Sequence, residues 1–266
     1  MATIKNEVVI KSVALMTGME CEAKVCPSNN KGIRFYYAGK SVTANIDNVV
    51  STEHCTVIGN SDVKVMLIEH FMAACAICKI DSLDVYLTHF ELPILDGSSK
   101  GWVDAFESIG IESPNEKVCK VVEPVYYLNG KTHLVILPSD NLNVTYGVNF
   151  KHKDLNNRWV CLNDIEQVTK ARTFGYLNEL EMLQKAGYAR GANIDNTVGL
   201  TEEGYTTELN SEYEPVKHKI LDLIGDLYLV GFNILNAKAE IIVKEAGHTV
   251  HTIVAKELKN KFIEEE

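Results

Sequence analysis

The stretch Glu214–Val230, EPVKHKILDLIGDLYLV, decides how the rest of the chain is interpreted. Pro215 suits the first turn of a helix. Apolar residues then recur at helical spacing, and three polar residues interrupt them four positions apart: His218, Asp222 and Asp226. Side chains at this spacing stack along one face of a helix. The stretch therefore predicts a helix with a row of polar side chains.

The polar row could hold a metal ion, because a His and an Asp one helical turn apart can bind one ion together. Lys219 follows His218 and would add a cation beside the same position. Gly225 would let another backbone or a ligand approach closely. The alternative is a polar stripe that faces solvent, since such spacing also arises by chance. The apolar residues around the row favour burial, and buried polar groups need partners.

Composition restricts the class of protein. The chain has 266 residues, of which 46% are hydrophobic and 23% charged, as in globular proteins. A net charge of −10 argues against a nucleic-acid binder, whose footprint is basic. The seven cysteines are scattered and odd in number, which favours reduced thiols in the cytoplasm over a disulfide framework. No signal peptide is visible, and the apolar run VVIKSVALM is too short to span a bilayer.

The pattern along the chain predicts strands followed by helices, twice over, which is typical of an α+β fold. The segment at 111–117, IESPNEK, is the best candidate boundary between two similar domains, 1–113 and 114–266, each a sheet packed on helices. Strands are predicted within 7–37 and at 83–87, 118–127, 131–137, 142–150 and 239–245. Helices are predicted at 63–79, 100–109, 177–187 and 214–230, with a short one after Asn163-Asp164 and a terminal one from His248 to about Lys261.

The pair Glu69-His70 interrupts the predicted helix at 63–79, which is otherwise apolar nearly all round. Adjacent helical residues point about 100° apart, so one could bind a metal while the other reaches water beside it. A carboxylate in that place is a natural general base. The alternative is a buried ion pair within the core.

Two further positions could carry chemistry. Thr173, in ARTFGY, could donate to a developing oxyanion, or it could cap a helix. His248 follows Gly247 at a strand-to-helix junction, and pairing with Asp226 would hold it protonated, as suits a general acid; it could instead cap the terminal helix. Cys75 and Cys78 lack a second CxxC pair and are predicted to be core residues. Four other histidines are predicted on the surface or in loops: His54, His89, His133 and His152.

Together these blocks resemble one family. The chain resembles UDP-3-O-acyl-N-acetylglucosamine deacetylase, a zinc amidase of lipid A biosynthesis. The resemblance rests on five blocks in this order: EHFMAACAICKIDSLDV, ELPILDGS, ARTFGY, HKILDLIGDLYLVG and AGH. The resemblance covers about residues 8–260. It implies two α+β domains with the active site between their helix layers, and release of acetate from a UDP-linked, acylated N-acetylglucosamine.

The resemblance also implies a role for each matching residue. The zinc ligands would be His70, His218 and Asp222, although two imidazoles and a carboxylate also accept Fe²⁺. Glu69 would be the general base. His248 would be a cationic histidine that Asp226 orients. Thr173 and Lys219 would surround the substrate carbonyl, and Phe174 would be an aromatic contact to the substrate. The expected partner is a UDP-linked sugar substrate, and no nucleic acid is expected. The chain is expected to be a monomer without a transmembrane segment that contacts a membrane transiently.

Three positions depart from the family pattern. Met16 stands where the family usually has a His, Leu67 where a Thr is common, and His251 where an Asn is common. These changes spare the expected zinc ligands and base. They leave two alternatives open: a zinc amidase of the same family that acts on another N-acetyl sugar, and a non-catalytic protein that binds nucleotide sugars.

Overall fold

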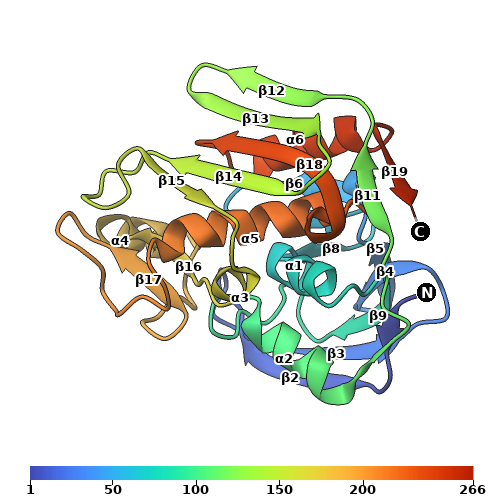
Figure 1. Ribbon diagram of the computed structural model, residues 1–266. Coiled ribbons are helices and arrows are strands. Elements are labelled where there is room, and N and C mark those ends of the chain that lie inside the picture. Colours follow the sequence, from blue (N-terminus) through green and yellow to red (C-terminus); the bar gives the residue numbers. More distant parts are fainter. Residues whose placement is uncertain (266) are drawn as a thin grey trace.

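Two β-sheets form the outer layers of the protein, and the main helices lie between them (Figure 1). The computed structural model describes residues 1–265. The first sheet has five strands in the order β2-β3-β9-β4-β5. Its strands are β2 (Val8–Val13), β3 (Glu20–Pro27), β9 (Ser82–Leu87), β4 (Gly32–Tyr37) and β5 (Lys40–Thr43).

The second sheet has seven strands and is built around β18 (Ala237–Lys244). β18 pairs antiparallel with β13, and parallel with both β14 and β11. The other strands are β11 (Val118–Val121), β12 (Val125–Asn129), β13 (Thr132–Pro138), β14 (Asn143–Val148), β15 (Arg158–Cys161) and β19 (Phe262–Glu265). Alternate residues of β18 are buried, so one face of this sheet packs on helices and the other is more open.

Four helices fill the space between the sheets. In Figure 1, α1 (Glu69–Ile77) and α2 (Lys100–Ile109) lie on the side of the first sheet, and α5 (Glu214–Tyr228) and α6 (His248–Leu258) on the side of the second. This arrangement confirms the predicted α+β class. The division into domains 1–113 and 114–266 stays a prediction. Within residues 1–265, no helix has both the length and the apolarity needed to cross a membrane.

The helices α1 and α5 pack directly against each other at the centre of the protein. Fourteen of the fifteen residues of α5 are buried, which excludes a solvent-facing polar stripe. Gly225 makes the close approach that its sequence context predicted. A Cβ atom added there would lie 2.1 Å from the carbonyl oxygen of Glu69. Only a glycine lets the two backbones come this near, so Gly225 sets the distance between the helices.

The predicted helix at 63–79 was wrong at its first turns. Lys64–Met66 forms strand β8, which pairs with β7 (Val57–Gly59), and α1 begins only at Glu69. Leu67 lies between β8 and α1 and has a φ of 61°, a left-handed value that is incompatible with an α-helix. An apolar run that is buried on every side does not reveal its period, so strand and helix could not be separated there.

Shorter elements complete the fold. The remaining strands form three small sheets: β6 (Val49–Ser51) with β7 and β8, β16 (Thr173–Tyr176) with β17 (Thr197–Leu200), and β1 (Thr3–Ile4) with β10 (Ile111–Glu112). The remaining helices are α3 (Ile165–Thr169), α4 (Leu177–Lys185) and two 3₁₀ turns at Ile46–Asn48 and Ile234–Asn236. The terminal helix ends at Leu258 rather than near Lys261, because the chain turns there into β19.

Candidate active site and metal centre

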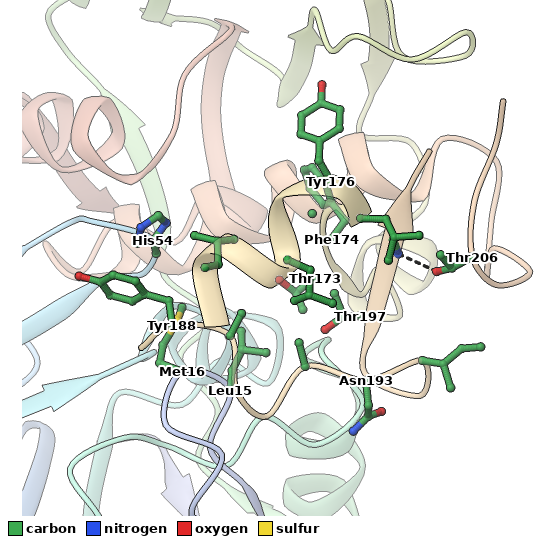
Figure 2. A pocket seen from close by; sticks show the side chains of 18 residues that line it. Leu15, Met16, His54, Thr173, Phe174, Tyr176, Tyr188, Asn193, Thr197 and Thr206 are labelled. Carbon is green, nitrogen blue, oxygen red and sulfur yellow. Dashed lines mark hydrogen bonds between the residues drawn. The ribbon is translucent and has the colours of Figure 1, made fainter. Parts of the chain in front are cut away.

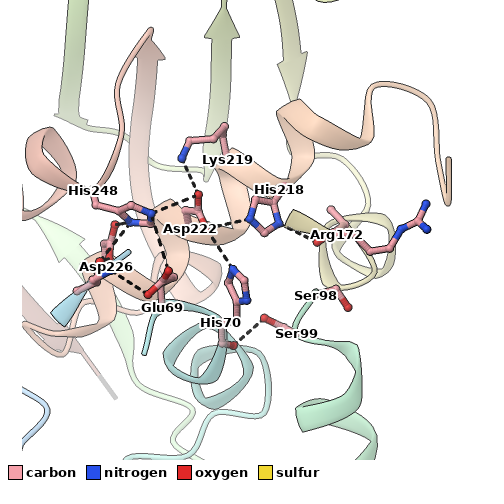
Figure 3. Close-up of polar contacts among 12 residues, drawn as sticks. Glu69, His70, Ser98, Ser99, Arg172, His218, Lys219, Asp222, Asp226 and His248 are labelled. Atoms are coloured by element: carbon pink, nitrogen blue, oxygen red, sulfur yellow. Dashed lines mark hydrogen bonds and ion pairs between the residues drawn. The ribbon is translucent and has the colours of Figure 1, made fainter. Parts of the chain in front are cut away.

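Three side chains from α1 and α5 meet where the helices face each other (Figure 3). The first turn of α1 supplies His70, and α5 supplies His218 and Asp222 one turn apart. Their ligand atoms all lie within 4.8 Å of one another, and all three residues are buried. The Oδ1 atom of Asp222 is 3.7 Å from His70 Nε2 and 3.4 Å from His218 Nε2. Both imidazoles therefore aim at the same carboxylate oxygen.

The donor set fits a divalent cation. Asp222 Oδ1 is buried and has no hydrogen-bond partner among residues 1–265. A buried carboxylate oxygen without a partner is costly, because it has lost its hydration and gained nothing in return. A cation between this oxygen and the two imidazole nitrogens would compensate all three atoms. Two histidines and one carboxylate are also a known set for zinc that keeps a position open.

His218 is held in the form that a metal ligand requires. Its Nδ1–H donates to the carbonyl oxygen of Ala171 at 2.9 Å, which leaves the lone pair of Nε2 facing Asp222. Burial lowers the pKa of His218 to about 4, so the imidazole is neutral at neutral pH. The ring of Phe174 packs edge-on against it, with 5.8 Å between ring centroids.

A buried ion pair that the sequence did not reveal fixes the loop bearing Ala171. The Nε and Nη2 atoms of Arg172 donate to the two carboxylate oxygens of Glu214 at 2.9 and 3.1 Å. The backbone N–H of Arg172 donates to the same carboxylate at 2.9 Å. The pair thereby ties the segment that carries Thr173 to the N-terminus of α5. Neither residue stood out, because Arg172 and Glu214 are 42 positions apart.

Lys219 lies beside the three candidate ligands. Its Nζ donates to Asp222 Oδ2 at 2.6 Å, so the second carboxylate oxygen is partnered where the first is not. Burial opposes ionisation of Asp222, but the positive charge of Lys219 and the nearby imidazoles hold its pKa well below the usual range. Asp222 is therefore an anion with one oxygen available to a cation.

A second group of charged residues lies next to the first (Figure 3). His248, the first residue of α6, donates from Nδ1 to Asp226 Oδ2 at 2.8 Å. Its other nitrogen, Nε2, is 3.9 Å from Glu69 Oε1 and 3.9 Å from Asp222 Oδ2. Burial alone would lower the pKa of His248, but the carboxylates of Asp226 and Asp222 raise it to about 9. The imidazolium thus points its Nε2–H toward the space around Glu69.

Thr56 links Glu69 to Asp226 and is another residue that sequence reasoning missed. Its backbone N–H donates to Glu69 Oε2 at 3.0 Å, and its hydroxyl donates to Asp226 Oδ1 at 2.6 Å. Burial raises the pKa of Glu69. A carboxylate with a raised pKa is a better proton acceptor at neutral pH. A threonine just before a short strand, β7, carries no motif, so the sequence offered no signal for it.

The candidate site opens into a small polar pocket that adjoins a larger apolar cavity. The pocket has a volume of about 110 Å³, and the cavity about 380 Å³. Leu15, His54, Thr173 and Phe174 line both spaces, so one continues into the other. The cavity lies against α4 and the segment that follows it, as Figure 2 shows. Its further lining includes apolar side chains, among them Met16, Leu177, Leu180, Leu183, Ala192 and Ile194.

Comparison with known proteins places the chain in a family. Residues 1–260 match the family model of LpxC, UDP-3-O-acyl N-acetylglycosamine deacetylase. The chain belongs to this family. Curated relatives named UDP-3-O-acyl-N-acetylglucosamine deacetylase include those of Leptospira biflexa, 35% identical over 96% of this chain and 88% of the relative, and Nautilia profundicola, 33% identical over 96% and 90%. A third, of Geotalea uraniireducens, is 32% identical over 99% of this chain and 87% of the relative.

In this member of the deacetylase family, eight of the nine predicted site residues line the polar pocket, and the ninth, Asp226, lies behind His248. The eight are Glu69, His70, Thr173, Phe174, His218, Lys219, Asp222 and His248. Thr173 begins strand β16, so the structure does not support its alternative as a helix cap. The roles assigned to these side chains stay predictions.

The three residues that depart from the family pattern lie around the same site. Leu67 lines the polar pocket, Met16 lines the apolar cavity, and His251 contacts Asp226. His152 lies in the loop between β14 and β15, as predicted, but it is buried, with Nε2 2.9 Å from the carbonyl oxygen of Gly204. His54 is exposed as predicted, but its side chain also lies at the junction of the two spaces.

Proposed function

We propose that the protein is a zinc-dependent hydrolase that removes the acetyl group from UDP-3-O-(3-hydroxyacyl)-N-acetylglucosamine, yielding acetate and the free amine in lipid A biosynthesis. The observation that carries this proposal is the continuity between the polar pocket and the apolar cavity. A substrate with a polar reacting amide and a long acyl chain needs both spaces side by side. Membership of the deacetylase family supports the same reaction.

His70, His218 and Asp222 would hold the metal. When bound, a zinc ion would supply a Lewis acid that polarises the acetamide carbonyl and makes nearby water more acidic. The neutral state of His218 and the unpartnered Oδ1 of Asp222 support this assignment. Fe²⁺ could occupy the same donors, since the set is not selective for zinc.

Glu69 would act as the general base. Its carboxylate lines the pocket next to His70 and is fixed at Oε2 by the backbone of Thr56, which leaves Oε1 free to accept a proton from the attacking water. Attack on the acetamide carbon forms a tetrahedral oxyanion. Thr173 and Lys219, which line the same pocket, would donate to this oxygen.

His248 would protonate the departing amine. Its imidazolium is stabilised by Asp226 and directs Nε2–H into the pocket, 3.9 Å from Glu69. Transfer of that proton lets the C–N bond break, and acetate and the amino sugar leave. Phe174 would contact the substrate where the polar pocket meets the cavity, and the acyl chain would lie against α4.

We also propose that the protein acts as a monomer in the cytoplasm, in transient contact with a membrane. The seven cysteines are all free within the described chain, which suits a reducing compartment. Domains 1–113 and 114–266 would each supply one of the two helices that form the site.

The test is acetate release by the purified protein after measurement of its metal content. With about one zinc per chain, we expect acetate from the UDP-linked acylated sugar and far less from the same sugar without its acyl chain. Equal rates on both would favour a different N-acetyl sugar as substrate. Tight binding of the nucleotide sugar with no acetate released by the zinc-loaded protein would indicate a non-catalytic binding protein.

A further inference from the structure

The carboxylate of Asp226 accepts hydrogen bonds from three side chains. His248 and His251 both approach Oδ2 with Nδ1, at 2.8 and 2.9 Å. The hydroxyl of Thr56 donates to Oδ1 at 2.6 Å. An ionised carboxylate can only accept, so Nδ1 carries the proton in both imidazoles. Asp226 is fully buried and therefore depends on these donors for compensation.

His251 also has a hydrogen-bond partner on the side of its ring away from Asp226. It lies one turn after His248 on α6 and is fully buried. Its Nε2 is 3.0 Å from the hydroxyl of Tyr146, and that hydroxyl is 2.9 Å from the carbonyl oxygen of Ala246. The imidazole is thus fixed at both nitrogens. It connects the strand that carries Tyr146 to the carboxylate that contacts His248.

We infer that His251 is a positioning residue for His248, acting through the carboxylate of Asp226. The inference rests on the proposed function, in which His248 is the group that protonates the leaving amine. His251 itself does not line the pocket, so it does not touch the substrate.

The physical reason is the freedom of an aspartate carboxylate. The torsion that rotates it is broad and has no sharp minimum, so a single donor does not fix its plane. Thr56 fixes Oδ1, and without His251 the other oxygen would be bound to His248 alone. The carboxylate and the His248 ring could then turn together. A shift of about 1 Å in a reacting group costs on the order of 10²-fold in rate, so this freedom would lower kcat.

Two substitutions of His251 separate its role as a donor from its role in packing. His251→Asn places an amide N–H close to where Nδ1 stands, so it keeps the hydrogen bond to Asp226 but loses the contact with Tyr146. His251→Leu keeps the bulk and removes the donor. His152→Asn is the matched control, because it removes another buried imidazole that binds a carbonyl oxygen outside the site.

The first experiment measures kcat and KM for each metal-loaded variant. We expect His251→Leu to lower kcat by roughly 10–100-fold with little change in KM, as loss of an orienting partner does. His251→Asn should retain most of the activity, and His152→Asn should retain it as well. If His251→Leu does not fold, His251→Met takes its place: it also fills the space without a donor to Asp226 and should lower kcat by the same 10–100-fold.

The inference is overturned if the folded His251→Leu, or His251→Met in its place, has the kcat of the wild type. It is also overturned if His251→Asn loses as much as His251→Leu, or if KM changes and kcat does not. If the metal-loaded wild type itself releases no acetate, the result contradicts the proposed function instead.

The second experiment needs no activity. Proton NMR of the metal-free protein reports the Nδ1–H resonance of His248 directly. It should move in His251→Leu and stay in place in His251→Asn and His152→Asn. An unmoved resonance in His251→Leu would overturn the positioning role even if no substrate were turned over.

Discussion

Replacing Gly225 by alanine tests whether the packing of α1 on α5 sets the geometry of the site. The new Cβ would lie 2.1 Å from the carbonyl oxygen of Glu69, 2.9 Å from its carbonyl carbon and 3.2 Å from the backbone nitrogen of Ala73. These are backbone atoms in a buried helix, so no side chain can rotate out of the way. The two helices must move apart.

The size of the effect follows from the contact distance. Carbon and oxygen pack no closer than about 3.3 Å, so the helices must separate by roughly 1.2 Å at this point. Overpacking of this kind costs about 1–3 kcal/mol, and the better helix propensity of alanine offsets about 1 kcal/mol of it. We expect the free energy of unfolding to fall by at most about 2 kcal/mol.

The effect on the site should be larger than the effect on stability. Glu69 and His70 would move with α1, while His218 and Asp222 stay on α5. A displacement near 1 Å is expected to lower kcat by about 10²-fold. Metal affinity should fall by about 10–100-fold, because the ligands no longer converge.

The assay combines urea unfolding, metal competition with a chelator, and kcat on the acylated substrate. Gly101→Ala is the control, since that glycine also lies in a helix but its new Cβ would meet only side-chain atoms of Leu95. The nearest is the Cδ1 methyl at 2.7 Å, which can move. A folded Gly225→Ala protein with the metal affinity and kcat of the wild type would refute the reasoning. So would an equal loss in Gly101→Ala.

Three other perturbations test different parts of the site. Glu69→Gln should keep the metal and lower kcat by about 10²–10⁴-fold, because the amide cannot accept the proton. Ala192→Phe should fill part of the apolar cavity and lower kcat/KM for a long acyl chain more than for a short one. The third concerns pH: the pKa of Asp226 is depressed to about 2 and the pKa of His248 is raised to about 9, so their pairing should stabilise the fold fully between about pH 4 and 6.5. Stability against urea should fall as the pH drops toward 2, where Asp226 is protonated, and as it rises through 9, where His248 loses its charge.

Each of these three has a contradicting result. Wild-type kcat in metal-loaded Glu69→Gln would remove Glu69 from the role of base. Ala186→Phe, on the exposed end of α4 outside the cavity, is the control for Ala192→Phe, and equal effects in the two would deny the cavity a role in binding the chain. In Asp226→Asn the dependence of stability on pH should weaken at both ends; an unchanged profile would assign it to other groups.

Residue order alone determined much of the fold and most of the candidate site. Helix α5 was predicted from its proline, its apolar period and its polar row, because these are local features that repeat at the spacing of a helix. The helix at 100–109 and the strands of the first sheet follow from local periodicity in the same way. The candidate ligands and base came from polar residues in apolar surroundings, together with the resemblance of several blocks in order.

Tertiary structure decided what connects distant segments. The start of α1 at Glu69 depends on the pairing of β8 with β7, since an apolar run without a polar face has no readable period. The partners of the site residues, Thr56, Arg172 with Glu214, and His251 with Tyr146, are far apart in sequence and carry no motif. Spacing along a chain specifies which side chains share one helix face. The hydrogen bonds that orient them come from other elements, and only packing brings those elements together.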